Sequence, residues 1–179
     1  MTMRSITWGV ATLVLALIVH FSSVIAIPSL SENDAWRRLL AQTTHNQMQV
    51  IKDVAATNQL WAFHAPDTKF AICRFDLSNG PVRVDLQLLR GYWSVAIYDD
   101  ESRNFYAADG YDLMRPAMSL MLLGPDHAQE ADDALPISVP SYEGLVVIRA
   151  PLDSQLMEDT VIAVLEKATC TEIELAKNS

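Results

Sequence analysis

The sequence predicts an α+β protein: a mainly antiparallel β-sheet or sandwich with a packed C-terminal helix, preceded by one N-terminal transmembrane helix. Three observations support this prediction. An uncharged apolar run opens the chain, several segments in the middle alternate apolar and polar residues, and an amphipathic stretch follows Pro151. Alternation with a period of two indicates half-buried strands, whereas apolar spacings of three and four indicate a helix.

The first segment has the length of a membrane-spanning helix. The run from Ile6 to Ile27 contains no charged residue, and at ~1.5 Å per residue it can cross a hydrocarbon core of ~30 Å. A cleaved signal peptide is the alternative, because Val24-Ile25-Ala26 offers permissive residues to signal peptidase. Secretory apolar regions usually run only ~7–15 residues, however. We therefore expect residues 1–27 to be an anchor and residues 28–179 to form a single domain.

The charge of the chain argues against nucleic acid as a partner. Residues 1–27 contain one charged side chain, Arg4, so the remainder carries 12 basic and 22 acidic side chains, a net charge of -10. Such a surface is repelled by phosphate backbones and by anionic lipid headgroups. We expect a solvated acidic surface that keeps the domain soluble.

The segments between residues 69 and 108 predict two consecutive hairpins. The apolar stretch 69–77 ends in the turn sequence Ser78-Asn79-Gly80-Pro81, and the alternating segment 82–88 follows it. Residues 93–97 alternate again, and a polar run over 99–104 then turns the chain into residues 105–108. An antiparallel sheet follows from hairpins of this kind.

The flanking segments complete the predicted fold. Residues 118–124 and 144–150 are apolar runs typical of central strands, separated by an acidic loop that contains Glu130, Asp132 and Asp133. Ser31 and Asp34 predict a short helix over about 32–42. Asp153 can cap a helix to about Ala168, whose apolar face contains Met157, Val161, Val164 and Leu165. We expect the tail from Thr171 to fray.

Few residues suggest chemistry. The chain has no Gly-x-Ser-x-Gly, phosphate-binding Gly-rich loop, dinucleotide fingerprint or His-Glu-x-x-His sequence, and we expect no cofactor. His45, His64 and His127 lack a recognised metal spacing, so surface or loop roles are expected. A metal site built from His45, His64 and an acidic residue is the minor alternative.

The two cysteines leave three interpretations open. Cys73 lies in a predicted strand and Cys170 at the end of the predicted C-terminal helix. Cys73 would need an activating base to act as a nucleophile, and His64 is the nearby candidate in the sequence. The other interpretations are two free core thiols or a disulfide that joins the helix to the sheet.

An aromatic segment suggests an interaction surface. Arg90-Gly91-Tyr92-Trp93-Ser94 places a cation beside two aromatic residues. In an alternating strand Trp93 should face the core and Tyr92 the opposite side. We expect the solvent-facing side of the strands near Arg90, Tyr92 and Tyr98 to form the interaction surface, because exposed aromatic and Arg side chains often anchor interfaces.

Three segments carry a resemblance to a known family. FAICRFDLSNGPVRV, GYWSVAIYDDESRNFYAAD and ADDALPISVPSYEGLVVIRAPL resemble the bacterial family called domain of unknown function 1254, best over residues 70–150. Its most specific pieces here are Cys73-Arg74-Phe75-Asp76 with Gly80-Pro81, Tyr92-Trp93-Ser94 and Glu143-Gly144-Leu145. Phe75 stands where a Tyr is usual. The layout resembles the short, membrane-anchored form of that family.

The resemblance implies a β-rich domain in the bacterial envelope and transfers no catalytic residue. It also implies a companion protein that resembles domain of unknown function 1214. We expect a single-pass protein of the inner membrane whose domain faces the periplasm. An even cysteine count in an exported domain then favours a disulfide between Cys73 and Cys170.

Two function classes stay open at this point. The first is a binding or assembly module of the envelope that works with a companion protein. The second is an envelope enzyme, hydrolase-like, with a dispersed active site. The missing catalytic signatures favour the first class.

Overall fold

A computed structural model describes residues 3–30, 39, 43–51, 65, 67–87, 93–110, 117–127 and 133–173. The chain divides into two compact units, residues 1–38 and 39–179, which are described separately. The short helix predicted over about 32–42 falls almost entirely outside the described residues.

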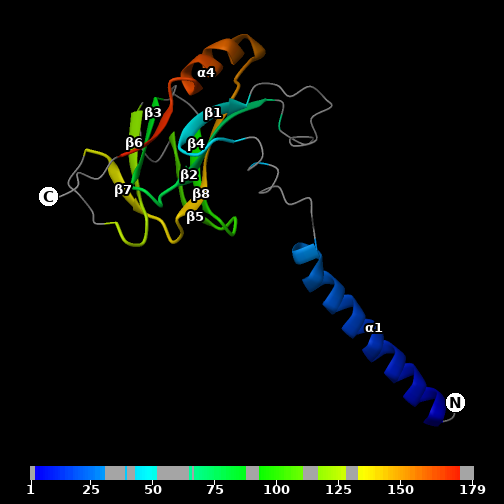
Figure 1. Ribbon diagram of the computed structural model, residues 1–179. Helices are drawn as coiled ribbons and strands as arrows, with labels where there is room; N and C mark the ends of the chain where they lie inside the picture. Colours follow the sequence, from blue (N-terminus) through cyan, green and yellow to red (C-terminus); the bar gives the residue numbers. More distant parts are fainter. Residues whose placement is uncertain are drawn as a thin grey trace. The chain divides into compact units, whose positions relative to one another are not determined.

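The first unit contains helix α1, Met3–Leu30 (Figure 1). Its segment Met3–Ile27 is long and apolar enough to cross a membrane, and none of its most apolar window is buried in the protein. Its polar side chains are partly satisfied within the helix, because the hydroxyls of Thr7, Thr12 and Ser23 each donate to a carbonyl oxygen four residues earlier. Such internal pairing is what a lipid environment requires of polar groups.

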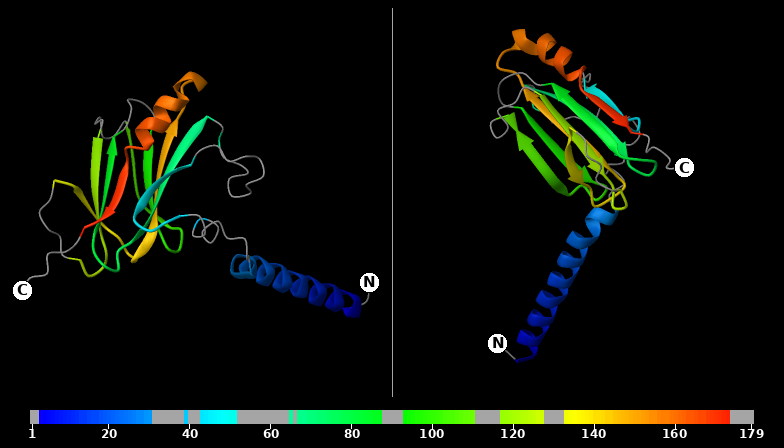
Figure 2. Two further views of the ribbon diagram at one scale, coloured as in Figure 1. Left: turned by 45° about the horizontal axis from the view of Figure 1, so that its top comes forward. Right: turned by 90° about the vertical axis from the view of Figure 1, so that its left-hand side faces the viewer.

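The second unit is a sandwich of two sheets, which confirms the α+β prediction (Figures 1 and 2). Sheet A has the order β1–β2–β8–β4–β5 and sheet B the order β7–β6–β3–β9. All described pairs of neighbours are antiparallel except β6 and β7, which run parallel. The strands are β1 (Gln47–Ile51), β2 (Thr68–Asp76), β3 (Val82–Gln87), β4 (Ser94–Asp99), β5 (Asn104–Asp109), β6 (Ala117–Leu123), β7 (Leu135–Ser138), β8 (Glu143–Pro151) and β9 (Thr169–Glu172).

The first of the two predicted hairpins is wrong. β2 pairs with β1 and β8 in sheet A, whereas β3 pairs with β6 and β9 in sheet B. Residues 77–81 therefore form a corner between the sheets, in which Leu77 is buried and Gly80 lies against the backbone of Ile173. The physical reason is burial: the apolar faces of both strands point into one core, and packed sheets lie ~10 Å apart.

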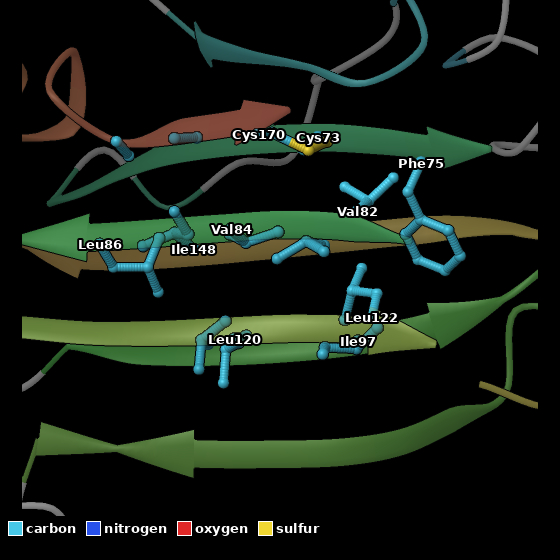
Figure 3. Packing of buried hydrophobic residues seen from close by; sticks show 14 of the residues in the cluster. Cys73, Phe75, Val82, Val84, Leu86, Ile97, Leu120, Leu122, Ile148 and Cys170 are labelled. Atoms are coloured by element: carbon cyan, nitrogen blue, oxygen red, sulfur yellow. A yellow bond between two sulfur atoms is a disulfide. The ribbon is translucent and has the colours of Figure 1, made fainter. Parts of the chain in front are cut away.

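Apolar residues from both sheets fill that core. Figure 3 shows Phe75 of β2 and Ile148 of β8 from sheet A, and Val84 of β3 and Leu120 of β6 from sheet B, within this core. The strands alternate as the sequence predicts, since Val82, Val84 and Leu86 are buried and Arg83, Asp85 and Gln87 are not. The predicted central positions of residues 118–124 and 144–150 are confirmed in β6 and β8.

The second predicted hairpin, β4–β5, is confirmed. Its turn is built around Asp99, which is 1% exposed. The Asp99 carboxylate accepts hydrogen bonds from the backbone amides of Glu101 and Arg103 and from the Nε of Arg103 at 2.8 Å. Burial works to raise the pKa of Asp99, but the hydrogen bonds and charge of Arg103 outweigh it, so its pKa lies below the ordinary value.

The turn predicts a pH-dependent loss of stability. Asp99→Asn keeps an acceptor oxygen but loses the charge facing Arg103, and we expect it to lower the free energy of unfolding by about 1–2 kcal/mol at neutral pH. A carboxyl whose pKa is lowered on folding contributes stability above its unfolded pKa and loses it as the pH falls through the folded pKa. The difference in the free energy of unfolding between wild type and variant should therefore shrink below about pH 4. Urea titrations across that range measure it, and a pH-independent difference contradicts it.

The C-terminal region differs from prediction in three ways. Asp153 does not cap the helix: a 3-10 turn, η2 (Gln155–Met157), precedes α4 (Glu158–Leu165), which has no side-chain cap. Cys170 lies in strand β9 and not at the helix end. The residues after Thr171 do not simply fray, because Glu172 belongs to β9; residues 174–179 lie outside the described part.

Helix α4 lies across one end of the sandwich, in contact with β2 and β3 (Figure 2). Val161 and Leu165 are buried, as the predicted apolar face requires, whereas Met157 is exposed. Lys69 of β2, itself 5% exposed, forms an ion pair with Glu158 at 2.6 Å. The helix is thus held by apolar contacts and by one buried cation.

Candidate functional site

Tyr98 is the one residue of the predicted interaction surface that the described part of the chain contains. It lies half-buried in β4, on the outer face of sheet A, while its neighbours Val95 and Ile97 point into the core. Arg90 and Tyr92 lie outside the described residues. Trp93 is buried, which confirms its predicted inward position.

Tyr98 belongs to a row of side chains that crosses four strands. It pairs with Leu145 of β8, which pairs with Arg74 of β2, which pairs with Gln47 of β1. Directly opposed residues in such ladders have Cβ atoms ~4.5–5.5 Å apart. The outer face of sheet A therefore brings together an aromatic ring, an aliphatic side chain, a guanidinium group and an amide, which we call the Tyr98 row.

Arg74 supplies the charge of this row. Its Nη2 donates to Oε2 of Glu143 at 3.0 Å, and its side chain is 15% exposed. Its Nε is buried and has no hydrogen-bond partner. Glu143 thus balances the guanidinium charge of Arg74 within the outer face.

The middle of the outer face is closed to solvent. Ile72 and Leu145 are 1% and 6% exposed, although neither belongs to the core between the sheets. Exposed residues of this face lie nearer its margins: Gln47, Asn104, Ala107 and Arg149. A partner can therefore reach the rim of the face, including Tyr98, but not its centre.

A polar clamp joins the ends of three strands near Arg74. Asn46, with φ 55°, donates from Nδ2 to the carbonyl oxygen of Asp76 and to Oε2 of Glu172, both at 3.0 Å. Its Oδ1 accepts the backbone amide of Asp76 at 2.8 Å. Hydrogen bonding from Ser78 is the main cause that lowers the pKa of the Asp76 carboxyl, and His45 lies 3.9 Å from it. These contacts fasten strands together.

The outer face of sheet B carries a second polar network. Arg83 donates to Asp85 at 3.1 Å and to Asp133 at 2.9 Å, and the Ser119 hydroxyl donates to Asp85 at 2.5 Å. The carboxylates of Asp133 and Asp85 raise the pKa of Arg83. Arg83 and Asp85 form an ion pair within β3. Through Ser119 and Asp133 this network links β3 to β6 and to the segment before β7. Of the three acidic residues named for the predicted loop, Asp133 is the one that the structure describes.

The cysteines pair. Cys73 of β2 and Cys170 of β9 form a disulfide with Cα atoms 6.3 Å apart, and both residues are buried (Figure 3). The bond joins sheet A to sheet B, and not a helix to the sheet. It overturns the interpretations of Cys73 as a nucleophile and of two free thiols; His64 lies outside the described residues. A buried disulfide is typical of oxidising compartments.

No metal centre is evident in the described part of the chain, where no three His, Cys, Asp or Glu side chains converge. His45 approaches Asp76, and the Nδ1 of His127 accepts the Gly124 amide at 2.9 Å. Both imidazoles thus take part in local contacts at the ends of strands.

The family described as "Protein of unknown function (DUF1254)" matches residues 45–172. The chain belongs to this family. The match covers β1 to β9, including the disulfide and the Tyr98 row, so the described sandwich is the DUF1254 domain of this protein. A comparison with curated proteins found no match.

Two solved structures share the fold of this DUF1254 domain. The VPA0106 protein from Vibrio parahaemolyticus is 13% identical with a TM-score of 0.63, over 78% of this chain and 34% of that chain. An uncharacterized protein from Burkholderia cenocepacia is 11% identical with a TM-score of 0.50, over 81% of this chain and 40% of that one. This chain therefore spans well under half the length of either structure.

Proposed function

We propose that this DUF1254 protein is a membrane-tethered binding or assembly module of the bacterial envelope, which works with a companion protein. The observation that supports this most is the Tyr98 row, where an aromatic side chain lies beside a closed apolar patch and a guanidinium donor on the outside of the sandwich. Aromatic and Arg side chains in such surroundings are typical anchors of protein interfaces.

The proposal places the domain in the periplasm, with α1 as an uncleaved anchor in the inner membrane. The apolar span Met3–Ile27 and the buried disulfide support this placement. Anchoring confines both partners to one surface and raises their effective concentration without any new contact.

The solved structures that share this fold are longer chains. This chain spans 34% and 40% of those chains. We propose a companion that resembles domain of unknown function 1214.

Reporter fusions test the topology. We expect alkaline phosphatase fused after Ser179 to be active in a Gram-negative host, because the enzyme needs export to form its disulfides, and the fusion to remain in the membrane fraction. A fluorescent cytoplasmic reporter at the same site should stay dark. Inactive phosphatase with a fluorescent reporter reverses the orientation, and a soluble, shortened product shows that residues 1–27 are cleaved.

Pull-down from detergent-solubilised membranes tests the binding role. Tyr98→Ala, Tyr92→Ala and Arg90→Ala should each reduce recovery of a specific partner about tenfold or more, as removing an interface anchor does. Gln87→Ala is the control, because this exposed side chain lies in sheet B.

Two results contradict the binding role. The first is partner recovery that the three substitutions leave equal to that of Gln87→Ala. The second is the lack of any specific partner together with turnover of an envelope substrate by the purified protein, which favours the hydrolase-like alternative.

A further inference from the structure

Strand β9 reaches the core of the domain through a single side chain. Of its four residues, Thr169, Thr171 and Glu172 are exposed and Cys170 is buried. Among the described strands it pairs with β3 alone, over Val82–Asp85. The apolar attachment of β9 is therefore the disulfide itself.

Among the described residues, β9 also lies close to β1, and its other hydrogen bonds are few. Beyond its ladder with β3, Glu172 accepts from Asn46 in an exposed position, and the amide of Ile173 donates to the carbonyl oxygen of Pro81 at 2.8 Å. Ordering four residues costs conformational entropy of the same size as a few backbone hydrogen bonds return. The ladder alone does not hold such a strand firmly.

The element before β9 has its own attachment. Val161 and Leu165 of α4 are buried, and Glu158 is paired with Lys69. Ala168, the last residue before β9, is also buried. β9 can therefore leave the sandwich while α4 stays in place.

We propose that oxidation of Cys73 and Cys170 is the step that closes β9 onto the sandwich, and that the reduced chain folds with β9 detached. In the reaction, a thiolate of the chain attacks the disulfide of a thiol–disulfide oxidoreductase, and the second thiol then resolves the mixed disulfide. The Cys73–Cys170 bond forms, and the oxidoreductase leaves as a dithiol that has accepted two electrons and two protons.

The two states differ in what they expose. With β9 detached, Cys170 is accessible to the oxidoreductase and the backbone edge of β3 is uncovered over Val82–Asp85. After closure both sulfur atoms are buried, so a reductant reaches the bond only when β9 opens. Closure thus follows arrival in an oxidising compartment and is retained there.

Hydrogen–deuterium exchange of the full chain in detergent micelles tests the proposal. In Cys170→Ala, amides of residues 169–173 and those amides within Val82–Asp85 that donate to β9 should exchange about tenfold or more faster than in the oxidised wild type, whereas the amides that donate to β6 and those of β8 keep their protection. Leu122→Ala is the control, since it weakens the core of sheet B with the disulfide intact. In this variant the amides of β9 should lose no more protection than those of the neighbouring strands.

A second variant keeps the test decisive. In a chain that ends at Ala168, the amides of β8 should be as protected from exchange as they are in Cys170→Ala, because in both variants only the docked β9 is missing. Unchanged protection of residues 169–173 in Cys170→Ala overturns the proposal. Loss of protection in β8, in either variant, also overturns it, because the strand is then needed for the whole fold.

Discussion

Phe75→Ala is expected to lower the free energy of unfolding by about 3–5 kcal/mol, the usual cost of deleting a fully buried ring. Phe75 is inaccessible to solvent and points between the two sheets (Figure 3). Its ring also fills the space beside Gly144, where a Cβ atom would collide with it. The neighbouring backbone is already closely packed, so it cannot move in to fill the space that the lost ring leaves.

Urea denaturation of the full chain in detergent measures this loss. Phe105→Ala is the matched control, because Phe105 loses the same atoms but lies only half-buried on the edge strand β5. Its loss should be less than half as large. Equal losses in the two variants would show that Phe75 does not occupy the centre of the core.

Removing the disulfide by Cys73→Ala with Cys170→Ala is expected to cost up to about 4–5 kcal/mol of unfolding free energy. The bond closes a loop with a sequence separation of 97, and long loops gain the most from a cross-link because the unfolded chain loses more freedom. The same urea titration measures the loss, which should persist at every pH because disulfide-bonded cysteines do not titrate.

Maleimide labelling provides the control for that experiment. Wild-type protein isolated without reductant should react at neither cysteine, even when unfolded in urea. Reaction at both positions under those conditions means that the bond is missing, and the stability of the double variant then says nothing about a cross-link.

The features that local sequence determines are the ones predicted correctly. The alternation around Val84 and around Val95 identifies strands and their buried faces without any knowledge of their partners. The β4–β5 hairpin follows from the polar turn between its strands. Burial of every second residue is a property of one strand, so it is readable from one segment.

The features that the sequence did not predict correctly depend on residues far apart in the chain. Residues 69–77 and 82–87 look like a hairpin because their link is short, but β2 takes β8 as its partner. β9 has four residues, too few to show a period, and its position depends on β3 and on Cys73. β1 and β7 were missed for the same reason, because short edge strands are defined by their neighbours.

The candidate surface shows the same division. Alternation predicts that Tyr98 faces away from the core, since it lies between Ile97 and Asp99, which point inward. Arg74 was missed as part of this surface. It joins Tyr98 only because Leu145 of β8 lies between them, and that pairing spans about 70 residues of sequence, far beyond the reach of a local pattern.

If α1 anchors the protein as proposed, the position of β1 has a mechanical consequence. β1 is an edge strand near the start of the sandwich, so tension along the N-terminal segment acts first on the five β1–β2 register pairs. The opening stops at the next strand, because Cys73 of β2 is covalently bonded to Cys170. Released from β2, residues 43–51 can span at most roughly 30 Å. The release of β1 would thus lengthen the connection to an anchor while the disulfide-linked core stays folded.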